Sequence, residues 1–317
     1  MEDLEVYGKI PTGWYVVATS EELGAGDVLR RHYFGRELVL WRTEGGEPAL
    51  VDAYCPHMGA HFGHGGRVDG DNLRCPFHGF SFGASGQCTG IPYEGDPVPD
   101  LRVPAMVVQE HSGLILAWYD AKGRSPEWSV PELPTDGWTG MALDSFHVHS
   151  HPQETSENSV DFGHFRFVHG FDAPHIRTEV ALDGPLLTAG YGFRRSLDPD
   201  GDENLIVDVE IDIEVHGLGY SLVNIHVPSY ELRFRQFVLP TPIDGEHIEL
   251  RLATAIPKQD DPEATKWLLG TTFDTLKAEV AEDIPIWENK RYVARPGLAA
   301  SEKRIAVYRG WARQFYE

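Results

Sequence analysis

The N-terminal third of the chain consists of short apolar runs separated by turn residues, a pattern typical of a small all-β unit. The runs predict strands at residues 14–17, 38–41, 49–51, 101–108 and 114–119. A stretch rich in Gly, Pro, Ser and Trp follows at 121–140 and predicts a linker. We therefore expect one domain over residues 1–125 and a second over residues 126–317.

Residues 178–256 alternate strongly between apolar and polar positions, which predicts a large antiparallel sheet. The clearest strands are expected at 205–213, 231–239 and 248–255. The last two are expected to form a hairpin around Asp244 and Gly245. Together with the helices predicted on either side of it, this sheet makes the second domain α+β.

Within residues 154–170, the capping residues Thr155 and Ser156 precede a predicted helix that ends near Gly170. Two further helices are predicted at residues 262–293 and 301–317. In a helix, His164 and His169 lie about 140° apart, so both reach one ion only if the helix distorts or ends between them. Taken alone, two histidines at this spacing are more often core or surface residues than metal ligands.

A second group of histidines, His147, His149 and His151, alternates along a predicted strand and falls on one face of it. No carboxylate of the same phase accompanies them. We therefore expect ordinary strand residues or pocket lining here rather than a metal site.

Composition narrows the classes of partner. The 317 residues carry 27 Lys and Arg against 49 Asp and Glu, a net charge of −22, which argues against nucleic acid and anionic membranes. No uncharged apolar run reaches the ~18 residues of a membrane helix. The three cysteines form no disulfide framework, and the acidic residues 1–5 lack the apolar stretch of a secretory signal. We expect a cytoplasmic protein.

Two of the cysteines belong to the motif Cys55-Pro-His57, followed after 17 residues by Cys75-Pro-Phe-His78. Thiolate and imidazole are ligands of soft and borderline metals. A Cys2His2 zinc site keeps its cysteines together and its histidines together, whereas here each loop supplies one of each. The motif resembles that of a Rieske [2Fe-2S] cluster, in which Cys55 and Cys75 would hold one iron and His57 and His78 the other. The third cysteine, Cys88, is expected to be a reduced structural thiol, and the intervening His61 and His64 to cap a loop.

The residues after His78 bear on the potential of such a cluster. High-potential Rieske proteins place Ser and Tyr hydroxyls where this chain has Phe80 and Phe82. Fewer donors stabilise the reduced cluster less, so we expect a potential on the order of −150 mV.

With the Rieske motif upstream, Asn158-x-x-Asp161-x-x-His164-x4-His169 resembles the mononuclear iron motif of Rieske non-heme iron oxygenases. The resemblance covers most of the chain and is closest to the shorter α-subunit-only members, such as ketosteroid 9α-hydroxylase and dicamba monooxygenase. It implies a helix-grip catalytic domain, a curved antiparallel sheet holding ligand against a helix. Phe80 departs from the Trp frequent in that family.

The resemblance also implies roles for these residues. His164, His169 and an acid on the long C-terminal helix would bind iron(II). That acid lies shortly before a Trp, and we favour Asp283, with Glu282 and Glu279 as alternatives.

In the family, a bridging carboxylate links an iron histidine to the cluster histidine of the neighbouring chain in a trimer. Asp161 matches this carboxylate, with His164 as the iron histidine, His78 as the cluster histidine and Asn158 in support. Electrons would come from a separate reductase or ferredoxin, since no GxGxxG loop is present.

The predicted function is therefore the oxygenase component of a monooxygenase that uses O2 to hydroxylate, demethylate or desaturate a small hydrophobic organic substrate. The alternative is a Rieske electron carrier whose second domain only binds a ligand. That alternative leaves His164, His169 and Asp283 unexplained.

Overall fold

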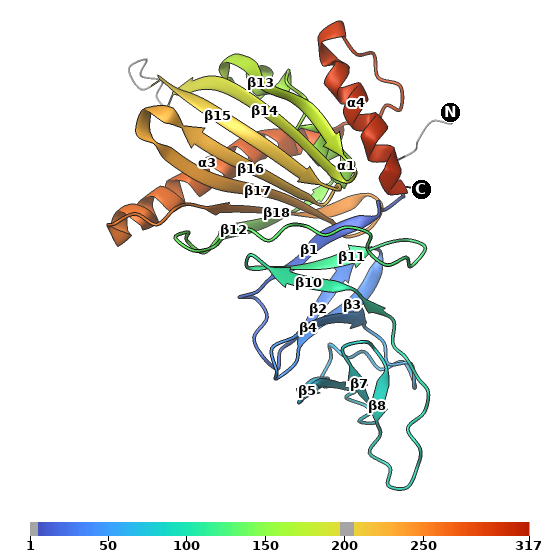
Figure 1. The fold of residues 1–317 in the computed structure, drawn as a ribbon. Helices are drawn as coiled ribbons and strands as arrows, with labels where there is room; N and C mark the ends of the chain where they lie inside the picture. The colour runs from blue at the N-terminus through green and yellow to red at the C-terminus, as the bar shows by residue number, and fades with distance from the viewer. Residues whose placement is uncertain (1–5, 197–205, 317) are drawn as a thin grey trace. The chain divides into compact units, whose positions relative to one another are not determined.

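The computed structural model describes residues 6–196 and 206–316, which separate into two compact units (Figure 1). One unit is Tyr15–Leu133, and the other combines Met1–Trp14 with Pro134–Glu317. The first is built from strands and the second from a large sheet with helices, so the predicted α+β class is confirmed.

The unit Tyr15–Leu133 contains three small sheets, with strand orders β1-β11-β10, β2-β3-β4-β9 and β5-β6-β7-β8. Their bounds are β1 Gly13–Thr19, β2 Val28–Tyr33, β3 Arg36–Arg42, β4 Pro48–Asp52, β5 Arg67–Asp69, β6 Asn72–Arg74, β7 Ser81–Gly83, β8 Cys88–Gly90, β9 Ala105–Met106, β10 Val108–His111 and β11 Leu114–Tyr119. The prediction of a single strand at 101–108 is wrong, because β9 covers only two residues of it. Pro104 stands directly before β9 and has no N–H to donate to a sheet ladder.

The other unit is dominated by one seven-stranded sheet of order β12-β18-β17-β16-β15-β14-β13, in which neighbouring strands pair antiparallel. Its strands are β12 Ala142–His149, β13 Asp172–Asp183, β14 Leu186–Ser196, β15 Ile206–His216, β16 Tyr220–Val227, β17 Leu232–Pro242 and β18 His247–Ala255. The β17–β18 hairpin turns at Asp244 and Gly245, as predicted. Of the strand predicted at 205–213, residue 205 lies outside the described residues.

The long helix α3, Pro262–Asn289, runs along one face of this sheet (Figure 1). Asp261 caps its N-terminus by accepting a hydrogen bond from Glu263 N at 3.0 Å. Its buried apolar residues pack on β12 and β18, and they are Phe273, Leu276, Val280 and Trp287. The predicted helix at 262–293 is confirmed, except that it ends four residues earlier.

The segment 154–170 differs from the single helix that was predicted. It contains two short helices, α1 Pro152–Glu157 and α2 His164–Phe167, and is not helical between them. The true N-cap is His151, whose Nδ1 accepts a hydrogen bond from Gln153 N at 3.1 Å. The strand β12 has already ended at His149, so the prediction that His151 shares a strand face with His147 and His149 is wrong.

The C-terminal helical segment is also shorter than predicted. The α-helix α4 spans Lys303–Ala312, between 3-10 turns at Ala300–Glu302 and Arg313–Tyr316. The 3-10 turn η2, Pro228–Tyr230, links β16 to β17. No helix in the described parts of the chain has both the length and the apolarity to cross a membrane.

Candidate metal centres

Two loops of matching backbone geometry carry the Cys-His motif. In each loop the cysteine N–H donates to a carbonyl five residues on, from Cys55 to Ala60 at 2.9 Å and from Cys75 to Phe80 at 2.8 Å. The glycine four residues after each cysteine bonds back to the cysteine carbonyl and has a positive φ, 77° at Gly59 and 71° at Gly79. Glycine adopts this backbone conformation without steric penalty, so both loops can close tightly.

The side chains of these loops converge and fit a cluster with two sulfur and two nitrogen ligands. The ring centres of His57 and His78 lie 4.7 Å apart, and the Nδ1 atom of each is buried without a hydrogen-bond partner in the structure. A buried imidazole nitrogen left unpaired is costly unless a ligand occupies it. The thiols of Cys55 and Cys75 contact each other, and burial raises the pKa of Cys55 to about 11. A bound metal would deprotonate such thiols.

Of the two histidines between the loops, His61 makes the expected loop cap, whereas His64 contacts Arg30 instead. His61 Nδ1 accepts a hydrogen bond from Gly63 N at 2.9 Å, so it caps its loop. His64 Nε2 lies 3.4 Å from Arg30 Nη1. Cys88 is a buried free thiol in the apolar core around the loops.

In the larger unit, His164, His169 and Asp283 come together from α2, the turn after α2, and α3. One ligand atom from each lies within 4.8 Å of the other two. The chain achieves this because α2 ends at Phe167, which frees His169 from the helical spacing and lets it turn toward His164. The sequence-based requirement for a helix end between the two histidines is therefore met.

The hydrogen bonds behind the two imidazoles fix their tautomers. His164 Nδ1 contacts the backbone carbonyl of Asp161, and His169 Nδ1 lies 2.9 Å from Glu282 Oε2. Both partners only accept, so both Nδ1 atoms carry the proton. In a neutral imidazole a proton on Nδ1 leaves the lone pair on Nε2, and His169 Nε2 faces Asp283 Oδ2 at 3.6 Å. This is the arrangement in which an outer carboxylate or carbonyl orients a metal-binding histidine.

Burial shapes the electrostatics of this group. Burial lowers the pKa of His164 to about 4, which keeps the imidazole neutral. Burial also raises the pKa of Asp283 to about 6, against the lowering effects of His169 and of a hydrogen bond from Asn158. Both shifts have the same main cause, because burial disfavours the charged form of each group.

The three acids considered for the third position occupy different environments. Asp283 is 7% exposed and points toward the histidines. Glu282 is bonded to the far side of His169, and its side chain is 53% exposed. Glu279 forms an ion pair with Arg195 of β14. Of these acids, the geometry therefore brings only Asp283 to the open side of both imidazoles.

Asp161 and Asn158, the two motif residues expected to act together, make separate contacts. Asp161 Oδ1 accepts a hydrogen bond from Gly163 N at 3.0 Å, and it is the Asp161 backbone carbonyl, not the carboxylate, that contacts His164. Asn158 bonds to Asp283. The sequence analysis expected Asn158 to support Asp161, and the bond to Asp283 is an additional contact. Asp161 itself precedes α2.

An aromatic cluster covers the metal-facing residues on the sheet side. Phe171, two residues after His169, stacks on Phe193 of β14 with ring centres 4.1 Å apart. Phe165 contacts both Tyr191 and Phe193, and the Tyr191 hydroxyl donates to the Ser159 carbonyl at 3.1 Å. These rings exclude water from one side of the site and fix the chain on either side of α2.

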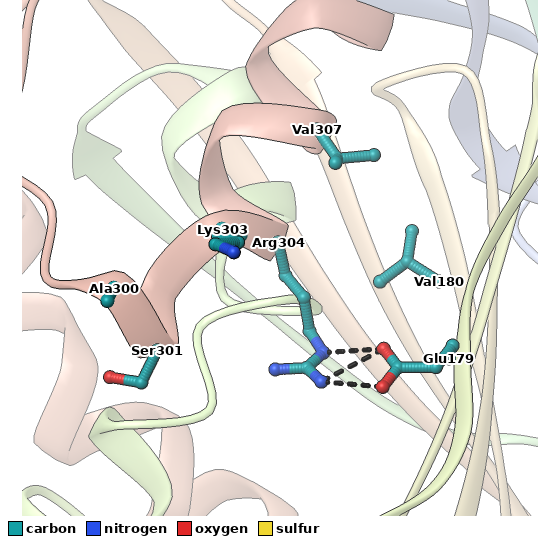
Figure 2. A pocket seen from close by; sticks show the side chains of 7 residues that line it. All are labelled: Glu179, Val180, Ala300, Ser301, Lys303, Arg304 and Val307. Carbon is teal, nitrogen blue, oxygen red and sulfur yellow. Dashed lines mark hydrogen bonds and ion pairs between the residues drawn. The ribbon is translucent and has the colours of Figure 1, made fainter.

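Two other features lie outside this site. His147 and His149 are exposed on β12 and join no cluster of three metal-binding side chains among the described residues. A surface hollow lies between β13 and α4, where Arg304 forms a two-pronged ion pair with Glu179 (Figure 2).

Comparison with known proteins agrees with both centres. Residues 13–109 match the Rieske [2Fe-2S] domain, and residues 117–316 match the 3-ketosteroid 9alpha-hydroxylase C-terminal domain. Cholesterol 7-desaturase nvd of Bombyx mori is 31% identical over 323 residues, covering 96% of this chain and 69% of that protein. The 3-ketosteroid-9-alpha-monooxygenase oxygenase component of Rhodococcus rhodochrous is 26% identical, covering 98% and 84%. The crystal structure of dicamba monooxygenase bound to dicamba has a TM-score of 0.78 at 23% identity and covers 98% of each chain.

A Rieske domain followed by a sheet-dominated catalytic domain defines an oxygenase component with a [2Fe-2S] cluster and a mononuclear iron. The chain belongs to the Rieske oxygenases with a 3-ketosteroid 9α-hydroxylase-type C-terminal domain. It is an oxidoreductase of a multicomponent system and acts on a hydrophobic substrate.

The packing around the cluster loops predicts how its potential can be changed. Phe82 is fully buried in the core that contains Cys55 and Cys75. In Phe82→Tyr, a hydroxyl that donates to cluster or cysteine sulfur would stabilise the reduced, more negative state. A bond worth about 1.4 kcal/mol raises the midpoint potential by about 60 mV. Protein-film voltammetry measures the change, with Phe62→Tyr in the same core as the control. A midpoint unchanged in Phe82→Tyr would contradict the prediction.

Proposed function

We propose that this chain oxidises a steroid-class substrate at an iron held by His164, His169 and Asp283. One observation carries the proposal: two imidazoles and one buried carboxylate converge, with one ligand atom of each within 4.8 Å of the other two. Two histidines and one carboxylate on one side of a metal are the ligand set of non-heme iron(II) oxygenases, which leave positions open for O2 and substrate.

The residues of the site have separate tasks in this proposal. When bound, the iron supplies reductive activation of O2 and the Rieske cluster supplies a further electron. Asp283 provides the negative charge that retains a divalent ion, and Asn158 holds that carboxylate in place. Glu282 and the Asp161 carbonyl keep the imidazoles in the ligating tautomer. The aromatic cluster around Phe171 and Phe193 keeps bulk water away.

The inner face of the sheet supports a large apolar substrate. Val209 and Ile211 of β15 lie opposite Phe193 and Tyr191 of β14, so all four point to the same side of the sheet. Ile225 of β16 lies opposite Ile211 and continues this apolar face. Relatives named for cholesterol and for 3-ketosteroids support a steroid-sized substrate. Insertion of one oxygen into a C–H bond and removal of two hydrogens both consume one O2, two electrons and two protons.

Electron delivery is proposed to involve a neighbouring copy of the chain in a trimer. Large apolar side chains are exposed at both centres, with Met58 64% and Phe77 62% exposed on the cluster loops and Phe167 88% exposed beside His169. Contact between copies would bury them. Asp161 would then link His164 to the neighbour's His78, and a reductase or ferredoxin would reload the cluster. Three buried free thiols support a reducing compartment such as the cytoplasm.

The iron content of variants tests the ligand assignment. Wild-type protein purified without oxygen is expected to hold about three irons and two sulfides per chain. His164→Ala and Asp283→Asn are each expected to hold about two irons, with the visible cluster spectrum unchanged. Glu279→Gln, which removes a nearby acid already paired with Arg195, serves as the control and keeps about three. About two irons in every variant and in the wild type would favour the electron-carrier alternative.

The bridge is tested by Asp161→Asn. Asparagine keeps the oxygen that accepts from Gly163 N, so the local turn is retained. Loss of the charge is expected to lower turnover by about 10–100-fold while iron and cluster contents stay unchanged. The rate at which the reduced cluster is oxidised, followed by stopped-flow spectroscopy, measures this electron transfer directly. Normal cluster oxidation in this variant would remove Asp161 from the electron path.

Substrate class is tested by oxygen uptake with cholesterol, a 3-ketosteroid and dicamba, in the presence of a reductase and ferredoxin. With the steroids, the amount of oxygen consumed is expected to equal the amount of product formed. With dicamba, no such coupled turnover is expected. Mass spectrometry separates hydroxylation, a gain of one oxygen, from desaturation, a loss of two hydrogens. Coupled turnover of dicamba alone would contradict the steroid proposal.

A further inference from the structure

The short helix α1 is wholly buried, although two of its six residues are glutamates. Glu154 is 1% exposed and Glu157 is 7% exposed. Buried carboxylates are rare unless they are paired, because burial removes their hydration. Burial raises the pKa of Glu154, and the ammonium of Lys290 opposes that rise. Two such groups in one short helix need a reason beyond packing.

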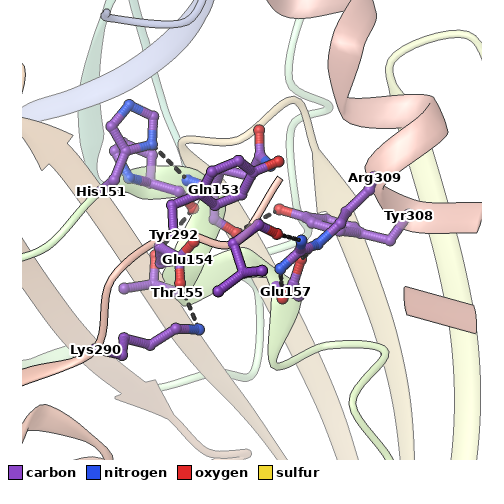
Figure 3. Close-up of polar contacts among 11 residues, drawn as sticks. His151, Gln153, Glu154, Thr155, Glu157, Lys290, Tyr292, Tyr308 and Arg309 are labelled. Carbon is purple, nitrogen blue, oxygen red and sulfur yellow. Dashed lines mark hydrogen bonds and ion pairs between the residues drawn. The ribbon is translucent and has the colours of Figure 1, made fainter. Parts of the chain in front are cut away.

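Each glutamate pairs with a cation from the C-terminal part of the chain (Figure 3). Arg309 of α4 donates two hydrogen bonds to Glu157, from Nε to Oε2 at 2.5 Å and from Nη2 to Oε1 at 2.8 Å. Lys290, the residue that caps the end of α3, forms an ion pair with Glu154. Nearby, the Tyr308 hydroxyl donates to the Gln153 carbonyl at 2.7 Å. Helix α1 is thus attached both to the end of α3 and to α4.

These attachments lie next to the metal-facing residues. Glu157 directly precedes Asn158, whose side chain bonds to Asp283. Lys290 lies seven residues after Asp283 on α3, about two helical turns or roughly 10 Å along the axis. Helix α1 therefore holds α3 at two points, through Asn158 at Asp283 and through Glu154 at the helix end. Arg309 prevents α1 from turning away from either contact.

We propose that Glu154 and Glu157 are positioning residues for the mononuclear iron site. Through Lys290 and Arg309 they hold Asn158 against Asp283 and so set the direction of that carboxylate. The inference rests on the proposed iron ligands, and it makes α4, which carries none of them, part of the active-site framework. Neither glutamate contacts the metal-facing atoms directly.

The chain contains a matched control on the same helix. Arg304 also joins α4 to the body of the unit through a two-pronged pair, with Glu179 of β13 (Figure 2). Glu179 lies on β13 and has no contact with Asn158 or Asp283 among the described residues, and its side chain is 73% exposed. Arg304→Gln and Arg309→Gln therefore both remove an arginine–glutamate pair from α4, but only the second acts on the segment that holds Asp283.

The test uses the full chain with its Rieske cluster intact. After a chelator removes the mononuclear iron, the protein is titrated anaerobically with iron(II) alone. We expect Arg309→Gln to bind at least about 10-fold more weakly than the wild type, and Arg304→Gln to bind within about 2-fold. Arg309→Lys, which keeps the charge but loses the two-pronged geometry, is expected to fall between them. The EPR spectrum of Co²⁺ bound in place of iron should change in Arg309→Gln and not in Arg304→Gln.

Equal iron affinity in the two glutamine variants, measured where both are folded, would overturn the proposal. Should Arg309→Gln not fold, Lys290→Met tests the other contact, the ion pair between Lys290 and Glu154. The Lys290 side chain is one-third exposed, so this variant is expected to fold. Unchanged affinity in that variant would likewise overturn it. Failure of the wild type to take up iron in a His164-dependent manner would instead refute the proposed function itself.

Discussion

The buried carboxylate of Asp283 is the constraint on which the larger unit depends. It lies on the face of α3 that also carries Phe273, Leu276, Val280 and Trp287 and packs against the sheet. Its pKa of about 6, against an ordinary 3.8, corresponds to a cost on the order of 3 kcal/mol for the ionised form. That pKa already includes the lowering effects of His169 and of the Asn158 hydrogen bond, so these offset the effect of burial only in part. A divalent ion bound by Asp283 and the two histidines would remove this cost, so metal binding and folding would stabilise each other.

This constraint also explains which of three acids faces the site, and it was partly visible in the sequence. Apart from Thr272, which is also buried, the buried positions of α3 are 273, 276, 280, 283 and 287, which step alternately by three and four residues and form one stripe. Asp283 falls in that stripe, whereas Glu279 and Glu282 fall beside it. A charged residue in an otherwise apolar stripe indicates a partner in the interior. The helical pattern alone therefore favours Asp283, although it says nothing of what Glu282 and Glu279 contact.

Other features depended on contacts that no local pattern contains. The Cys-His loops were predictable because, within each loop, the cysteine, the histidine and the glycine lie within a few positions of one another. The start of α1 could not be predicted in this way. Thr155 and Ser156 resemble cap residues, but the N-cap is His151, whose Nε2 donates to the Lys9 carbonyl at 2.8 Å. That contact joins residues 142 positions apart. The pairing of Glu157 with Arg309 spans 152 positions and was equally hidden.

The charges around His169 complete the physical account of the site. A dication with one carboxylate and two neutral imidazoles keeps a net positive charge in a partly apolar environment. Glu282, on the far side of His169, supplies a compensating negative charge through the imidazole without occupying a metal position. Glu279 does not add to it, because Arg195 neutralises it and places a guanidinium 5.4 Å from the Phe171 ring centre. Three acids within about one helical turn thus have three different partners. Asp283 faces the proposed metal position, Glu282 bonds to the far side of His169, and Glu279 pairs with Arg195 beside the Phe171 ring.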